Sequence, residues 1–247
     1  RGGITHHLLD VLTVKQDSTV AWYQELARKT IDEIHSRGRD VIIVGGTGLY
    51  IKAIVDDLNF PDTDPVVRSR LELEAIEQGP AALFQRLEKL DPAAALAIDR
   101  ANTRRMIRAL EVIEITGKPF TANLPREESS RYPAALHFGL SQDRESLDIR
   151  VSNRVDSMWD AGLISEVEAL IGHGLREGVT AQKALGYAQV LQMLDGVLTS
   201  EQAREETKRV TRQYIRRQDT WFSRDSRLHW LGHYENRLEK ILTRLNS

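Results

Sequence analysis

The feature that most limits how this chain can fold is an aliphatic run followed at once by glycines. Val41-Ile42-Ile43-Val44 precedes Gly45-Gly46-Thr47-Gly48, and a helical pattern over 18–37 comes just before both. Four branched aliphatic residues after a helix favour a strand buried on both faces of a parallel sheet, and the glycines favour a tight turn after it. Residues 49–55 would begin the next helix. The segment 18–55 therefore predicts an α/β fold.

A different pattern begins at Asp64, where only helices are expected. Asp64-Pro65 and Asp91-Pro92 each place a capping carboxylate before a proline at the first helical position. Three apolar helix faces follow from the spacing: Val67, Leu71 and Ala75, then Leu83, Leu87 and Leu90, then Met106, Leu110 and Ile113. The chain is expected to contain an α/β core over 1–62 and 134–247 and a helical insertion domain over 63–133.

After a polar loop over 123–133, the pattern returns to mixed elements. Short strands are predicted over 134–140 and 228–231. Helices are predicted over 146–160, 163–172, 181–194, 200–222 and 235–245, with Ser200 as the cap of the longest one.

Composition excludes several classes of protein. Hydrophobic content of 41% with 28% charged residues is typical of a globular domain and excludes disorder and collagen. The absence of cysteine excludes disulfide scaffolds, thiolate metal sites and cysteine nucleophiles. No apolar run approaches the ~20 residues needed to cross a bilayer, and no signal peptide is evident. We therefore expect a cytoplasmic protein without a membrane partner. No exposed apolar stripe stands out, so the sequence does not determine the oligomeric state, and a monomer is the expected default.

The glycine motif over 45–50 is the first that indicates chemistry. Glycines after a strand let backbone N–H groups approach an anion, and the next helix offers its positive N-terminal end. Gly45, Gly46, Thr47 and Gly48 are therefore candidate diphosphate-binding residues, with Thr47 adding a hydroxyl. A tight turn without a ligand is equally compatible with the spacing. The motif is not a Walker A loop, because no Lys-Ser or Lys-Thr follows the glycines.

A near-neutral total charge hides basic clusters. The net charge is −2, yet residues 207–218 hold five basic side chains and no acidic one. Two helical stripes are basic: Arg209, Arg212 and Arg216 on one helix, and Arg104, Arg105 and Arg108 on another. Solvated charged faces are the usual interpretation of such stripes. The absence of acids and the interleaved Gln213 and Gln218 favour a surface that tracks phosphates, with an RNA backbone as the partner.

Two further motifs are less specific. The stretch 182–187 is basic and aromatic, and its Gly186 costs about 1 kcal/mol relative to Ala within a helix, which favours close packing or a bound backbone. Core packing by Tyr187 is the commoner alternative. His6 and His7 are adjacent, so on an extended segment they point to opposite faces and cannot easily share an ion. We assign no histidine to a metal.

Taken together, these motifs resemble the tRNA isopentenyltransferase family, the tRNA dimethylallyltransferases. The matching residues occur in family order across nearly the whole chain: 6–10, 45–50, Asp64-Pro65 with Arg68, Asp91-Pro92, Arg104-Arg105, 108–111, Thr116-Gly117, Arg150, Arg154, Met158, Gly162, 184–187, 211–214, Arg217-Gln218 and 220–222.

The resemblance implies a P-loop-kinase-like parallel-sheet core, incomplete at its N-terminus, with a helical insertion domain. It also implies transfer of a dimethylallyl group from dimethylallyl diphosphate to N6 of the adenosine 3′-adjacent to the anticodon in tRNA. Mg²⁺ assists the release of diphosphate, and the target base is flipped into a closed pocket.

The resemblance also implies roles for particular residues. Thr47 and Arg154 would be catalytic, with Arg154 stabilising the departing diphosphate charge. The residues implied to bind tRNA are Arg104, Arg105, Arg108, Lys183, Gly186, Tyr187, Arg212, Arg216, Arg217, Gln218 and Trp221.

The chain departs from the family pattern in one respect. Family members begin with a glycine-rich loop ending in Lys-Ser or Lys-Thr, followed by an Asp-Ser segment that supplies a general-base Asp, and this succession is not found in the 247 residues. Both would lie upstream of Arg1, so we expect this chain to be inactive alone, or nearly so. Two alternatives remain: a non-catalytic RNA-binding protein on a degenerate transferase fold, and a nucleotide or small-molecule kinase.

Overall fold

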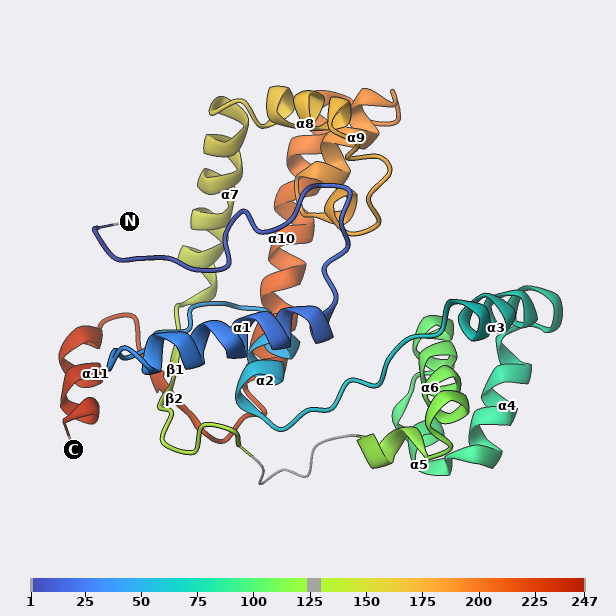
Figure 1. Ribbon diagram of the computed structural model, residues 1–247. Helices are drawn as coiled ribbons and strands as arrows, with labels where there is room; N and C mark the ends of the chain where they lie inside the picture. The colour runs from blue at the N-terminus through green and yellow to red at the C-terminus, as the bar shows by residue number, and fades with distance from the viewer. Residues whose placement is uncertain (1, 124–129, 247) are drawn as a thin grey trace. The chain divides into compact units, whose positions relative to one another are not determined.

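The computed structural model describes residues 2–123 and 130–246, and the chain divides into two compact units (Figure 1). Unit 1 comprises Arg1–Ile51 and Pro133–Ser247, and unit 2 comprises Lys52–Tyr132. Both described strands lie in unit 1, and the helices are shared between the units. The α/β class predicted from the sequence is confirmed. None of the helices in the described ranges combines the length and apolar character needed to cross a membrane.

Unit 1 is built around a two-stranded parallel sheet and a set of long helices. The strands β1 (His137–Leu140) and β2 (Leu228–Leu231) pair in parallel, with His137 opposite Leu228 and Leu140 opposite Leu231. The helices are α1 (Val20–His35), α7 (Arg144–Asp160), α8 (Leu163–Gly172), α9 (Tyr187–Leu194), α10 (Ser200–Phe222) and α11 (Arg237–Leu245), with a 3₁₀ turn at Ala181–Lys183. Helix α2 (Gly48–Val55) begins in unit 1 and ends in unit 2.

The strand predicted over 41–44 is wrong. These residues form no ladder, and Ile42 and Val44 are 86% and 89% exposed. Within the described residues, β1 and β2 pair only with each other, so the segment lacks the neighbouring backbone that a buried strand requires. The turn and the helix that follow form as predicted, because α2 begins at Gly48.

Two details of the predicted helices in unit 1 also need correction. The predicted helix over 181–194 is interrupted: the 3₁₀ turn ends, Gly186 adopts a φ of +94°, and α9 begins at Tyr187. Only glycine takes up this left-handed conformation at little cost, so Gly186 marks a helix start. The cap of α10 is Thr199 rather than Ser200, because Thr199 and Gln202 satisfy each other's backbone N–H groups in a capping box.

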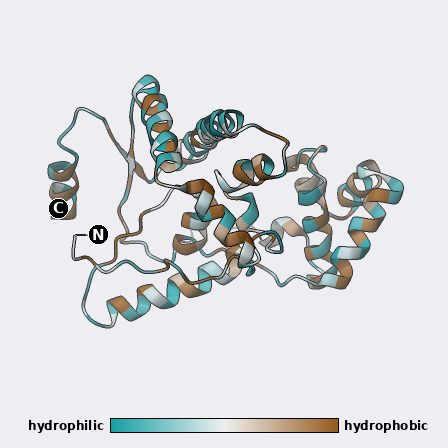
Figure 2. Ribbon diagram, turned by 90° about the horizontal axis from the view of Figure 1, so that it is seen from above, coloured by the Kyte–Doolittle hydropathy of each residue, from teal (hydrophilic) through white to brown (hydrophobic). Residues whose placement is uncertain are grey.

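The core of unit 1 lies where α8 and α9 meet. Leu163, Val167, Leu175 and Val190 are buried there, and partly buried side chains from 14 to 194 pack around them. Helices α7 and α10 pack along each other, with Val155 buried on α7 and Ala203 on α10. Figure 2 shows apolar and polar residues on the same helices, which is the amphipathic pattern expected of helices that bury one face.

Unit 2 is helical and follows its capping signals closely. It contains α3 (Pro65–Gln78), α4 (Pro80–Leu90), α5 (Pro92–Ala97), α6 (Thr103–Thr116) and a 3₁₀ turn at Phe120–Asn123. Asp64 accepts hydrogen bonds from the N–H groups of Val66 and Val67, and Asp91 accepts one from Ala94. The two predicted helix starts are therefore confirmed.

The predicted apolar faces form most of the unit 2 core. Leu71, Leu83, Leu87, Met106 and Leu110 are buried, and Val67, Ala75 and Ile113 pack against them. Leu90 is 46% exposed, because it is the last residue of α4. The predicted loop over 123–133 lies largely outside the described residues.

A buried carboxylate ties α6 to the start of α3. Glu111 is 0% exposed and accepts hydrogen bonds from Arg68, from Arg108 and from the backbone N–H of Asp64. Arg108 also donates to the carbonyl oxygens of Pro61 and Asp62. Burial acts to raise the pKa of Glu111, but the two guanidinium groups outweigh it and hold this pKa below its usual range.

We expect Glu111→Gln to destabilise unit 2 by about 3 kcal/mol, because it leaves two arginines without their carboxylate. The lowered pKa means that the stabilisation by Glu111 is present above its unfolded-state pKa and is lost as pH falls through its folded-state pKa. The measurement is amide hydrogen exchange along α3 and α6 between pH 7 and pH 3. Glu114→Gln is the control, since Glu114 pairs with Arg70 and Arg86 at an exposed position. Equal loss of protection in both variants would contradict the prediction.

Candidate functional site

The glycine turn leads directly into α2. The carbonyl oxygen of Thr47 accepts hydrogen bonds from the N–H groups of Tyr50 and Ile51, at 2.9 and 3.1 Å, which places Thr47 at the N-cap of the helix. The first N–H groups of a helix have no partner within it, and the helix dipole adds positive potential at the same end. Gly46, Thr47 and Gly48 therefore lie where backbone donors can face an anion.

One face of α10 packs against this turn. Tyr214 Oη lies 2.9 Å from Thr47 Oγ1, and Gln218 Nε2 donates to the Gly46 carbonyl oxygen at 2.8 Å. The Trp221 ring lies so close to Gly48 that a Cβ there would meet its Cδ1 at 2.1 Å. A Cβ at Gly46 would meet Gln218 Nε2 at the same distance. The Trp221 ring therefore leaves no room for a side chain at Gly48, whereas a Cβ at Gly46 would require the flexible end of Gln218 to move.

The sequence did not predict that these three α10 side chains contact the glycine turn. Gln218 and Trp221 are predicted tRNA-binding residues, and Tyr214 lies in the stretch 211–214 that matches the family pattern. The structure brings all three to the turn, although Trp221 remains 46% exposed. Their spacing of i, i+4 and i+7 is the signal that places them on one helix face, but the sequence does not show which element that face contacts.

Some basic side chains of the cluster over 207–218 form ion pairs or hydrogen bonds within the protein, and others are exposed to solvent. Lys208 pairs with Asp156 and Glu205 at 2.8 Å each, and Arg209 pairs with Glu206. Arg212 donates from Nη2 to Ser152 Oγ at 2.8 Å, and its Nε is buried without a partner in the part of the chain described here.

The last two basic residues of the cluster, Arg216 and Arg217, are exposed. The guanidinium of Arg217 lies 5.9 Å from the Tyr214 ring centroid. The surface available for phosphates on α10 is therefore shorter than the sequence suggests.

The other predicted tRNA-binding residues are spread over both units. In unit 1, Lys183 is exposed and Gly186 is buried. The Tyr187 hydroxyl donates to Glu166, and burial together with this contact raises the pKa of Tyr187 to about 12. In unit 2, Arg104 and Arg105 are exposed on α6, whereas Arg108 is engaged by Glu111.

Arg154 lies exposed on α7. Among residues 2–123 and 130–246, no hydrogen bond or ion pair joins it to the glycine turn. Its predicted role at the departing diphosphate stays a prediction.

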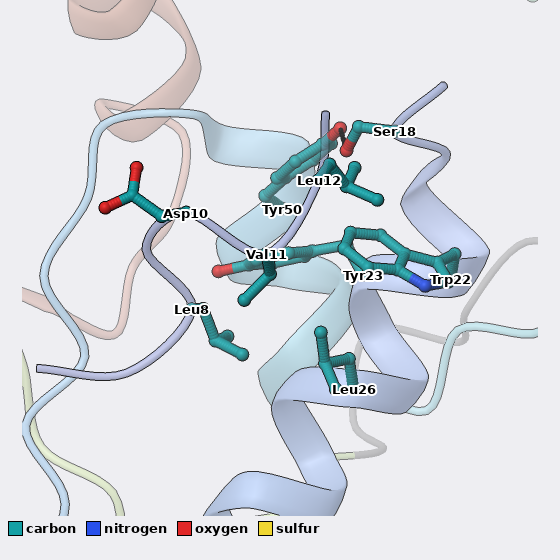
Figure 3. Close-up of a pocket in the computed structure, with 9 residues that line it drawn as sticks. All are labelled: Leu8, Asp10, Val11, Leu12, Ser18, Trp22, Tyr23, Leu26 and Tyr50. Atoms are coloured by element: carbon teal, nitrogen blue, oxygen red, sulfur yellow. Dashed lines mark hydrogen bonds between the residues drawn. The ribbon is translucent and has the colours of Figure 1, made fainter. Parts of the chain in front are cut away.

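A cavity of about 360 Å³ with both polar and apolar walls lies beside α2 (Figure 3). Its walls come from the N-terminal segment, from α1 and from α2, and they are Leu8, Asp10, Val11, Leu12, Ser18, Trp22, Tyr23, Leu26 and Tyr50. The rings of Tyr23 and Tyr50 stack with centroids 4.5 Å apart, and Ser18 Oγ lies 3.2 Å from Tyr50 Oη. The Asp10 carboxylate points away from these rings. The cavity thus offers an aromatic and aliphatic surface one helical turn from Thr47.

The described residues contain no group of three or more His, Cys, Asp or Glu side chains that could hold a metal ion. Mg²⁺ prefers carboxylate, phosphate and water oxygens in octahedral geometry. The protein side chains around the turn are hydroxyl, amide and aromatic groups, so they do not by themselves fit an Mg²⁺ site.

The fold and the glycine turn mark the chain as an α/β protein with an anion-binding type of helix start, and comparison with known proteins identifies its class. The family described as IPP transferase matches residues 1–225. A tRNA dimethylallyltransferase from Thermobifida fusca is 57% identical over 231 residues, covering 94% of this chain and 72% of the relative. One from Streptomyces griseus is 53% identical over 232 residues, covering 94% and 74%.

A solved structure shows the same relationship. The crystal structure of a tRNA isopentenylpyrophosphate transferase from Bacillus halodurans matches with a TM-score of 0.67 and 37% identity, covering 99% of this chain and 77% of that one. The chain belongs to the IPP transferase family. The resemblance found in its motifs is confirmed, and with it the fold and the transferase class of enzyme.

We expect Gly48→Ala to displace Trp221 and to destabilise unit 1 by about 1–3 kcal/mol, because the new methyl group overlaps the indole ring. Urea unfolding followed by tryptophan emission measures this effect, and a Trp221→Phe variant identifies the signal of that ring. Gly45→Ala is the matched control, since its Cβ would lie 3.4 Å from Ile51 Cδ1, an ordinary contact. If both variants unfold at the wild-type midpoint, the packing described here is wrong.

Proposed function

We propose that this chain serves the transfer of a dimethylallyl group from dimethylallyl diphosphate to N6 of the adenosine 3′-adjacent to the anticodon in tRNA. The observation that carries the proposal is the glycine turn at the start of α2, joined through Thr47 to the basic helix α10, in a member of this family. The turn suits a diphosphate, and α10 suits a polyanion such as tRNA. Their contact therefore supports a site that takes both dimethylallyl diphosphate and tRNA.

In the proposed reaction, the adenosine N6 forms a bond to C1 of the donor while the bond from C1 to the diphosphate oxygen breaks. Diphosphate leaves with the electron pair, and N6 loses a proton to a base. The backbone N–H groups at the start of α2 and the Thr47 hydroxyl would bind the diphosphate. Arg154 is the proposed partner of the negative charge that develops on it.

The cavity beside Tyr50 supports the choice of donor. A dimethylallyl group is a small, branched hydrocarbon, and the cavity walls include Leu8, Tyr23 and Leu26 together with Tyr50, which lies one helical turn from Thr47. Such a site accelerates the reaction mainly by holding the two reactants in a fixed geometry.

The proposal that the chain binds tRNA is supported by exposed arginine and lysine side chains. Arg216, Arg217 and Lys183 in unit 1, and Arg104 and Arg105 in unit 2, are free to meet phosphates. Extrusion of the target base from the anticodon loop would bring N6 to C1. We further propose that the chain acts as a cytoplasmic monomer, a proposal supported by the tRNA substrate and by a turn assembled from one chain.

Mg²⁺ remains part of the proposal as a partner of the diphosphate. Because the surrounding side chains do not form a carboxylate site, the ion would be held mainly by diphosphate and water oxygens. No step of the reaction is assigned to it.

The proposal is tested by measuring dimethylallyl diphosphate binding with Mg²⁺ in a calorimeter. We expect Thr47→Ala to weaken binding about 10-fold, since a hydrogen bond to a charged group contributes roughly 1.5–3 kcal/mol. Thr243→Ala is the control, because Thr243 lies on α11 and bonds only to the carbonyl of Glu239. Binding of tRNA without any diphosphate binding would instead favour a non-catalytic RNA-binding protein. Diphosphate binding without tRNA binding would favour a kinase-like enzyme.

We also expect the 247-residue chain to transfer dimethylallyl groups at a rate far below that of a relative such as the Thermobifida fusca enzyme. The physical reason is that these residues contain no glycine-rich loop ending in Lys-Ser or Lys-Thr. Incorporation of labelled dimethylallyl into tRNA by both proteins provides the measurement. Comparable rates would show that the chain needs no such loop.

A further inference from the structure

Two side chains of α10, Tyr214 and Gln218, form hydrogen bonds with atoms of the glycine turn itself. The structure assigns Tyr214 and Gln218 as positioning residues, which orient the Thr47 hydroxyl and the Thr47 backbone N–H toward the diphosphate, and it removes Gln218 from the surface that binds tRNA. This inference rests on the proposed function and adds to it the way in which the anion site is held in shape.

Tyr214 controls the Thr47 hydroxyl. A threonine hydroxyl rotates freely and has one proton to donate and two lone pairs that accept. The two hydroxyls lie 2.9 Å apart and either can donate. In the arrangement that we infer, Tyr214 donates to Thr47 Oγ1, and the Thr47 proton stays available for a phosphate oxygen. The Tyr214 ring is stiff and half-buried, so it fixes the position of Oγ1 at small entropic cost.

Gln218 controls the peptide between Gly46 and Thr47. In a planar trans peptide, the carbonyl oxygen and the N–H point in opposite directions. The Gly46 carbonyl accepts from Gln218 Nε2 and therefore faces α10. The N–H of Thr47 must then face away from α10, as a donor to an anion at the turn requires. Loss of the Gln218 amide would free this peptide to rotate.

Helix geometry separates these residues from Arg216 but not from Arg217, whose guanidinium lies 5.9 Å from the Tyr214 ring centroid. At about 100° per residue, Tyr214, Gln218 and Trp221 fall within about 60° of one another, while Arg216 lies on the opposite side. Arg216 and Arg217 are exposed, whereas Tyr214 and Gln218 are half-buried. One face of α10 therefore serves the diphosphate turn and another face serves the polyanion.

A double-mutant cycle on the 247-residue chain tests the role of Tyr214, with the affinity for inorganic pyrophosphate as the readout. We expect Tyr214→Phe to weaken pyrophosphate about 5-fold in the wild-type background and to have no effect in a Thr47→Val background. A group that acts through Thr47 gives this non-additive result, whereas a residue that only stabilises the fold weakens binding equally in both backgrounds. Equal effects, or no effect in either background, would overturn the assignment.

The role of Gln218 is tested with two ligands. We expect Gln218→Ala to weaken pyrophosphate about 5-fold and to change the affinity for an anticodon stem-loop RNA by less than 2-fold. Arg216→Ala, on the opposite side of α10, should do the reverse, weakening the RNA and lowering the salt dependence of its binding. Gln192→Ala, at an exposed position of α9, is the control for both ligands. If Gln218→Ala weakens the RNA and spares pyrophosphate, Gln218 contacts tRNA and the inference is wrong.

The outcomes also separate this inference from the proposed function. If the wild-type chain binds pyrophosphate and Thr47→Ala weakens it, the proposed diphosphate site stands whatever the cycle shows, and an additive cycle overturns only the positioning roles. If the wild-type chain does not bind pyrophosphate, both are overturned. Thermal unfolding of each variant verifies that the folded state is retained.

Discussion

The contact between α10 and the glycine turn is the constraint on which the candidate site depends. It joins residues 167 and 172 positions apart, through Thr47 with Tyr214 and Gly46 with Gln218. A side chain at Gly48 would collide with the Trp221 ring of α10, and one at Gly46 would displace the Gln218 amide. The same glycines that would let an anion approach the backbone thus also let α10 approach it.

Unit 2 is held together by a different kind of contact. Its helices begin at capping carboxylates a few residues away in the chain, and one buried carboxylate, Glu111, then ties α6 to α3. A charge buried in this way is tolerated because Arg68, Arg108 and a backbone N–H satisfy it. One consequence is that Arg108, which shares a helix with the exposed Arg104 and Arg105, contributes to the stability of the unit rather than to its basic surface.

The cavity beside Tyr50 and the glycine turn meet at α2. Tyr50 lines the cavity while Thr47 caps the helix one turn earlier. A donor with a charged head and a hydrocarbon tail suits this arrangement, in which the polar turn adjoins the aromatic wall of the cavity. The family membership of the chain and the local chemistry of α2 therefore support the same class of substrate, although each rests on separate observations.

The sequence by itself determined whatever depends on neighbours in the chain. The helix starts at Asp64 and Asp91, the apolar faces of unit 2, the glycine turn before α2 and the family could all be predicted, because capping and helical periodicity act within about four residues. Only the tertiary structure decided which distant segments of the chain contact one another. It left 42–44 exposed, turned Tyr214, Gln218 and Trp221 onto the glycine turn, and paired Lys208 with Asp156 of α7. A periodic pattern shows that a helix has a face, but the partner of that face is chosen by packing between segments far apart in the chain.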